Sequence, residues 1–150
     1  PVAVMSTSPR TSWTPTADQA GDHNVTFTVA DDGTPPLADT ELVTVTVQAI
    51  DTAPDSFVFT DQLDLARGAV ATSDEVTVAG INKPASIEIV GGTYAVNGDT
   101  YTDVAGSVAN GDRVRVRVVA STVSGGVSNA TLSIGGVSDT FSATTIELRR

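Results

Sequence analysis

Few side chains in this chain have the chemistry of a catalytic centre, because its 150 residues include one histidine and no cysteine. The histidine, His23, follows Asp22 in a segment that has no nucleophile motif beside it, so a Ser-His-Asp triad is not indicated. The Cys and His ligands of a zinc site are missing. The Gly-Gly pairs are turn signals and do not form a phosphate-binding loop before a helix. The sequence therefore predicts a protein that is not an enzyme.

One segment concentrates the basic side chains. Between positions 112 and 120, arginine and valine alternate, so a β-strand would present the arginines on one face and the valines on the other. The arginine face could bind an anionic glycan or a carboxylate-bearing partner, because a guanidinium matches the geometry of a carboxylate. It could equally be a solvent face paired with acids such as Glu88. The residues are Arg113, Arg115 and Arg117.

Two tyrosines flank the strongest hairpin signal of the chain. Tyr94 and Tyr101 lie on either side of Asn97-Gly98, a dipeptide that accepts the positive φ values of a type I′ turn. Aromatic rings exposed on such a scaffold could stack on sugar rings, which makes a carbohydrate-binding module one hypothesis. That hypothesis loses its basis if both rings are buried.

The chain is strongly acidic, with 18 Asp and Glu against 8 Lys and Arg, and its formal net charge is −10. This balance argues against nucleic acid as a partner, because phosphates require a basic surface. It fits a solvated acidic exterior. No stretch is long and apolar enough to span a bilayer. The sequence starts at Pro1 without a signal peptide, so we expect a processed product or a piece of a longer protein.

The composition favours strands. Hydrophobic residues make up 40% of the chain and aromatic residues only 5%. Val, Thr and Ile suit a pleated surface, and no window has a sustained helical period. Turns are predicted at Asn110-Gly111 and Gly135-Gly136, a bulge near Thr144, and a polar connection over 61–68. The predicted strands cover residues 25–29, 42–47, 57–59, 75–79, 85–90, 93–96, 99–102, 112–120, 129–134 and 137–148.

The first fifty residues carry motifs that occur together in a known type of repeat. They are WTPTADQAG at 13–21, VTFTV at 25–29, DGTPPL at 32–37 and VTVTV at 43–47. Positions 11–51 resemble the C-terminal half of cadherin-like or immunoglobulin-like repeats, which occur in tandem in bacterial surface and secreted proteins. In that family the position of His23 is usually Tyr, so His23 is expected to close the corner before the strand. Trp13 is expected to be the main core residue, with a ligand platform as the alternative.

The second part of the chain resembles another repeat unit of bacterial surface proteins. The resemblance covers positions 54–148, through YAVNG at 94–98, NGDRV at 110–114 and LSIGGVSDTF at 132–141. We therefore predict immunoglobulin-like β-sandwich modules in tandem, a partial module over 1–51 and a second module over 52–150. The first is about half the length of the family domain, and two or three strands cannot easily bury a core. The missing strands belong to a longer protein, or the second module covers the first, or another chain supplies them.

The segment from Ala49 to Asp55 resembles the acidic linker of cadherins, in which carboxylates of adjoining repeats hold calcium. Calcium requires six to eight oxygen ligands at one place. The candidate ligands by this resemblance are Asp31, Asp32, Asp51 and Asp55. The alternative is that these residues are ordinary solvated turn residues.

These features together predict a non-catalytic structural or adhesive module of a bacterial extracellular or cell-surface protein. Its partners would be neighbouring β modules or identical subunits. An alternative is a filament subunit completed by a strand from a neighbouring chain, with Pro1 to Met5 or Thr144 to Arg150 as the donor strand.

Overall fold

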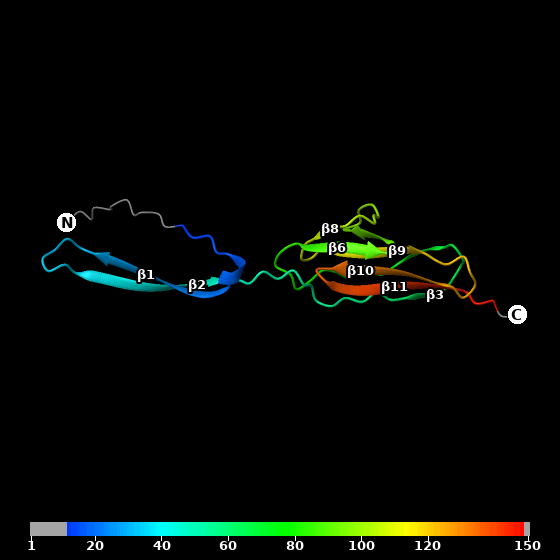
Figure 1. The fold of residues 1–150 in the computed structure, drawn as a ribbon, viewed down its shortest axis with the longest axis horizontal. Coiled ribbons are helices and arrows are strands. Elements are labelled where there is room, and N and C mark those ends of the chain that lie inside the picture. The colour runs from blue at the N-terminus through cyan, green and yellow to red at the C-terminus, as the bar shows by residue number, and fades with distance from the viewer. Residues whose placement is uncertain (1–11, 149–150) are drawn as a thin grey trace. The chain divides into compact units, whose positions relative to one another are not determined.

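The structure, a computed structural model, describes residues 12–148, and the chain divides into two units, residues 1–50 and 51–150 (Figure 1). Strands form nearly all the regular structure of the described residues, so the prediction of an all-β protein is confirmed. No helix among these residues is long and apolar enough to cross a membrane.

The first unit is a single long hairpin. A 3₁₀ turn at Ala17–Gln19 leads into β1 (Gly21–Ala30), which pairs antiparallel with β2 (Ala38–Val47) along the full length of both strands. The loop between them is stabilised by Asp31, whose Oδ1 accepts hydrogen bonds from the backbone N–H groups of Gly33 and Leu37. None of the described residues of this unit is buried. Among the described residues the hairpin has no second layer, and the interpretation of this unit as a partial module stays a prediction.

The two faces of the hairpin differ in chemistry, because residues alternate sides along each strand. Val25 faces Val43 across the pair on one side, and the next pair on that side joins Phe27 to Glu41. On the other side, threonine hydroxyls bond across the strands, for example Thr44 to the Asn24 side chain at 2.9 Å.

The second unit is a sandwich of two sheets, and β9 is the central strand of the smaller sheet. The larger sheet has the order β3-β11-β10-β6-β8. In the smaller sheet, the short strands β4 and β5 pair one after the other along one edge of β9, and β7 pairs along its other edge. The strands are β3 (Gln62–Leu65), β4 (Val70–Thr72), β5 (Val76–Thr77), β6 (Ala85–Val90), β7 (Thr93–Val96), β8 (Gly106–Val108), β9 (Arg113–Val119), β10 (Val127–Ile134) and β11 (Val137–Thr145).

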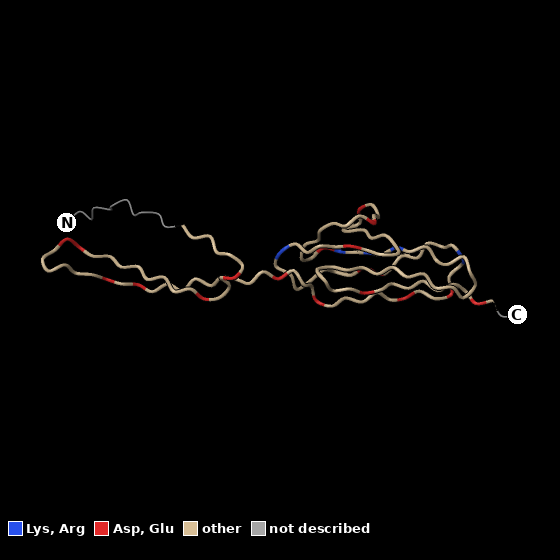
Figure 2. Tube along the Cα trace, in the orientation of Figure 1, with Lys and Arg blue, Asp and Glu red and all other residues tan. Residues whose placement is uncertain are grey.

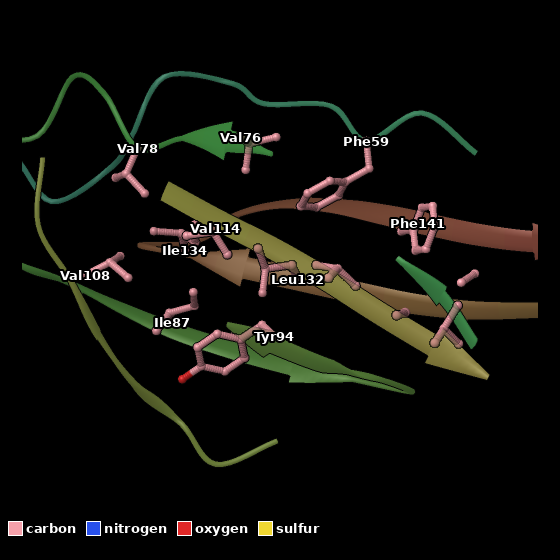
Figure 3. Close-up of a cluster of buried hydrophobic side chains, with 14 of the residues drawn as sticks. Phe59, Val76, Val78, Ile87, Tyr94, Val108, Val114, Leu132, Ile134 and Phe141 are labelled. Atoms are coloured by element: carbon pink, nitrogen blue, oxygen red, sulfur yellow. The ribbon is translucent and has the colours of Figure 1, made fainter. Parts of the chain in front are cut away.

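The core lies between these sheets, and both contribute to it (Figure 3). Val114 and Val116 of β9 are fully buried, as predicted from the alternation with arginine. They meet Leu132 of β10 and Phe141 of β11, which are also fully buried. The Phe141 ring packs edge-on against Phe59, with 6.4 Å between centroids. In the described residues, every buried side-chain nitrogen or oxygen atom has a hydrogen-bond partner.

One buried serine fills a gap in the smaller sheet. Between β4 and β5 the pairing with β9 is interrupted, and Ser73 lies at the interruption. Its N–H donates to the Val116 carbonyl at 2.8 Å, while its Oγ accepts from the Val116 N–H at 2.9 Å. A side-chain oxygen thus takes the place of a strand carbonyl, which keeps the fully buried Val116 amide satisfied.

The chain enters and leaves the second unit at opposite poles. At the entry pole, the Asp51 carbonyl accepts from the N–H groups of Asn82 and Lys83, close to the turns at 80–84 and 135–136. At the exit pole, the Ile146 N–H bonds to the Leu65 carbonyl, beside the loop at 121–126. The first strand, β3, runs parallel to the last strand, β11, and both point toward the exit pole.

Several predicted strands need correction. Residues 57–59 and 99–102 form no strand, although Phe59 is buried and Thr102 keeps a single bridge to Tyr94. The region predicted as a polar connection, 61–68, contains β3. The bulge expected near Thr144 is present as a register shift between Ala143 and Thr145 in the pairing with β3.

Candidate functional site

The arginine face lies on the solvent side of β9, and two of its three arginines pair with the same carboxylate, that of Glu75. The side chains of Arg113 and Arg115 reach Glu75 at 3.5 and 3.3 Å, one to each carboxylate oxygen. The predicted partner, Glu88, is on β6 in the other sheet, so that assignment is wrong. Both arginine side chains are more than half exposed, so these ion pairs contribute no more than about 1 kcal/mol each.

The third arginine stacks on a tyrosine. The Arg117 guanidinium carbon lies 3.7 Å from the centroid of the Tyr101 ring, a cation–π contact, and its Nε donates to the Thr72 hydroxyl at 3.3 Å. One face of Tyr101 is therefore covered by Arg117 and is not free to receive a sugar ring.

Tyr94 lies inside the sandwich. It is 3% exposed, and its hydroxyl donates to the Val104 carbonyl at 2.8 Å (Figure 3). Burial raises the pKa of this hydroxyl. Tyr94 is thus part of the packed interior, whereas Tyr101 is half-buried. Only one of the two rings is buried, so carbohydrate binding stays a prediction, with Tyr101 as its remaining aromatic residue.

A small hollow of about 70 Å³ lies on the arginine face, lined in part by Glu75, Tyr101, Arg113 and Arg115. Pockets for organic ligands are usually several hundred Å³, so this one has room only for water or for the tip of a side chain. The positive charge around it is partly offset by Glu75 and Asp99. As a site for an isolated carboxylate of a partner, the arginine face stays a prediction.

The proposed calcium ligands belong to both units of the chain. Asp31 and Asp32 lie at the tip of the hairpin, whereas Asp51 and Asp55 lie at the start of the second unit. Among residues 12–148, no three acidic or His side chains form a group that could hold a metal ion. One oxygen of Asp31 accepts two backbone N–H bonds, and one of Asp51 accepts from the Ala53 N–H. Calcium binding by these residues stays a prediction that a calcium titration would test.

The corner before β1 is closed by His23. Its Nε2 donates to the Gln19 carbonyl at 2.7 Å, and its ring packs edge-on against Trp13, with centroids 4.9 Å apart. This is the structural role expected of His23. Trp13 is not the core residue that was expected, because it is 43% exposed and packs only on the corner.

Two aspartates tie the beginning of the second unit to its last strand: Asp61, expected in a polar connection, and Asp139, expected in a strand. The Asp139 carboxylate accepts from the Phe59 N–H at 2.7 Å, and the Asp61 carboxylate accepts from the Ser142 N–H at 2.8 Å. These contacts join residues about eighty positions apart, so no local pattern in the sequence predicts them.

The described residues thus define an all-β protein, a two-layer sandwich preceded by a hairpin, with acidic side chains spread along both units (Figure 2). No family model and no curated protein sequence matches the chain. Among solved structures it is similar to "Crystal structure of the S-layer protein SbsC domains 4 and 5". The match has 14% sequence identity, covers 89% of this chain and 81% of that chain, and has a TM-score of 0.42. At that score the similarity leaves the function of this chain open.

Proposed function

We propose that the chain is a non-catalytic structural module of a bacterial surface or secreted protein, and that its second unit is a load-bearing spacer. The acidic, solvated surface and the motif resemblances support the extracellular setting. The observation that carries the load-bearing role is the parallel pairing of the first and last strands of the second unit, with the chain ends at opposite poles.

This arrangement determines how tension acts on the hydrogen bonds. When the two ends are pulled apart, the segment leading to β3 is drawn toward the entry pole and β11 toward the exit pole. The two strands must then slide past each other, so the bonds between them are loaded together. If strands are instead pulled apart from one end, the bonds break one after another, and each needs little force.

The bonds between these two segments come from both backbone and side chains. The Ile146 N–H bonds to the Leu65 carbonyl at 3.0 Å near the exit pole. Further toward the entry pole, the ties are the Asp61 and Asp139 carboxylates, each bonded to a backbone N–H of the other segment. Hydrogen bonds to a charged acceptor are about twice as strong as neutral ones. The side chains therefore extend the connection beyond the short ladder of β3.

Single-molecule force spectroscopy on the full chain tests this role. The chain has no cysteine, so two introduced cysteines define the pulling points. The pair Thr52→Cys and Glu147→Cys loads β3 and β11 in shear. The matched pair Arg67→Cys and Glu147→Cys pulls the same two strands apart from the exit pole. We expect a clearly higher unfolding force for the first pair, and equal forces would contradict the proposal.

A filament subunit is the second candidate, and the bare hairpin favours it. No residue of β1 or β2 is buried, and each strand has one edge without a strand partner in the described chain. One predicted donor strand needs correction: Thr144 and Thr145 already belong to β11, and the Ile146 N–H is bonded to Leu65. The other, Pro1 to Met5, lies outside the described residues. Negative-stain electron microscopy of the concentrated chain would detect filaments, and particles of one small size would exclude them.

A further inference from the structure

The apolar side of the hairpin, which we call the hairpin face, is exposed over most of its length, and only His23 and Val47 at its base are half-buried. Phe27 is 60% exposed and Val29 is 68% exposed, far more than expected for side chains on the inner side of a sheet. The remaining valines of the face are between one third and two fifths exposed. The hairpin face consists of Val25, Phe27, Val29, Val43 and Val45.

The face is large enough to support a specific contact. Taking about 150 Å² for a fully exposed valine and about 200–250 Å² for Phe27 and the adjoining Trp13, the exposed fractions leave roughly 500 Å² of mainly apolar surface. Two such faces would bury about 1,000 Å² together, which reaches the lower limit for a specific protein interface. The largest apolar patch on a typical soluble monomer covers about 300–600 Å² and is often functional.

The opposite side of the hairpin has a different composition. Thr44 and Thr46 bond to the side chains of Asn24 and Asp22, and these groups suit contact with water. Leu42, opposite Thr26, is the one large exposed apolar residue among the described residues of β1 and β2 on this side. The larger apolar area therefore lies on the hairpin face, which is the side that gains most from a second layer. Sheets that pack face to face keep their strands aligned within about 30°, with apolar side chains interdigitated between them.

We propose that the second layer is the hairpin face of a second copy of this chain, packed face to face about a two-fold axis. A second copy provides a face of matching length and composition. The charge pattern selects the orientation: one end of the face carries Asp39 and Glu41, and the other carries Trp13 and His23. When the two hairpins point in opposite directions, the acids of each copy lie over the aromatic and imidazole end of the other. When they point the same way, the acids face each other.

This pairing is closed, because both copies use the same surface and no hairpin face remains free to bind a third copy. It predicts a discrete dimer, in contrast to the open chain of subunits in a filament. It involves only the first unit, so its test is independent of the load-bearing role proposed for the second unit.

Analytical ultracentrifugation of the full chain and two neighbouring variants provides the first test. We expect a dimer for the natural sequence. Phe27→Glu places a charge in the hairpin face and should weaken the dimer by about 100-fold or more in Kd, as for a central interface residue. Thr26→Glu adds the same charge to the same strand on the opposite side, and it should change Kd by less than about threefold. A monomer at high micromolar concentration, filaments, or equal effects of both variants would overturn the proposal.

Disulfide trapping gives a second measurement that does not depend on how well Phe27→Glu folds. Val43 lies near the middle of the hairpin face, so it should approach the same residue of the partner copy across the two-fold axis. Val43→Cys should form a covalent dimer under mild oxidation, whereas Thr44→Cys, on the opposite side of β2, should remain monomeric. Cross-linking of Thr44→Cys in preference to Val43→Cys would show that the copies meet elsewhere and would overturn the proposal.

Discussion

Replacing Ser73 with alanine isolates the contribution of one side-chain oxygen to the smaller sheet. Ser73 is 3% exposed and Val116 is fully buried, so water cannot reach the amide that the serine hydroxyl satisfies. The backbone bond from the Ser73 N–H to the Val116 carbonyl does not involve the side chain and remains. The substitution thus leaves one buried N–H of β9 without a partner.

An unsatisfied buried N–H costs about 1–3 kcal/mol, so we expect Ser73→Ala to lower the free energy of unfolding by about 2 kcal/mol. For a unit of about 100 residues, that corresponds to a fall in Tm of roughly 8–16 °C. Ser138→Ala is the matched control: Ser138 is exposed, its hydroxyl bonds only to the Ser133 hydroxyl, and its loss should cost less than about 0.5 kcal/mol.

Urea unfolding measures the stability of both variants, and hydrogen exchange of the Val116 amide reports on the bond itself. We expect this amide to lose protection in Ser73→Ala beyond the loss explained by the lower global stability. If Ser73→Ala were no more destabilising than Ser138→Ala, or if exchange at Val116 followed only the global change, the assigned role of the serine oxygen would be wrong.

Three further predictions concern the second unit. Leu132→Ala, at a fully buried position between the sheets, should cost about 2–5 kcal/mol in urea unfolding. Asp139→Ala removes the acceptor of the Phe59 N–H and should cost about 1–2 kcal/mol, and it should lower the unfolding force between anchors at 52 and 147. Bonds from the Ala109 N–H and the Asn97 amide hold the pKa of Asp112 below its ordinary value of 3.8. Its stabilising contribution is therefore full above that value and is lost as pH falls through the folded-state pKa, so Asp112→Asn should show a weaker acid dependence of the urea midpoint.

Strand identity could be predicted where local pattern and burial agree. The alternation along β9 placed its valines inside and its arginines outside, because a strand with one buried face must repeat every two residues. The turn at Asn97-Gly98 was also predicted, and Asn97 has a φ of 52° as such a turn requires. The strand expected after it is only a bridge at Thr102. Turn chemistry determines where the chain reverses, and it does not determine how far the returning segment pairs.

Contacts between distant segments could not be predicted. Arg113 and Arg115 share Glu75, which directly precedes β5, a strand that pairs with β9. The expected partner, Glu88, lies in the other sheet. The choice depends on which strands become neighbours, which a single sequence does not reveal. The burial of Tyr94 has the same origin, since alternation within β7 does not tell which side of that strand meets the core.

The opposite placement of the two chain ends in the second unit has a consequence for length. β11 spans nine residues from one pole to the other, which is about 30 Å of extended chain. If copies of the second unit were joined end to end through these poles, each copy would add a similar length. The distance spanned by such an array would then increase in proportion to the number of copies.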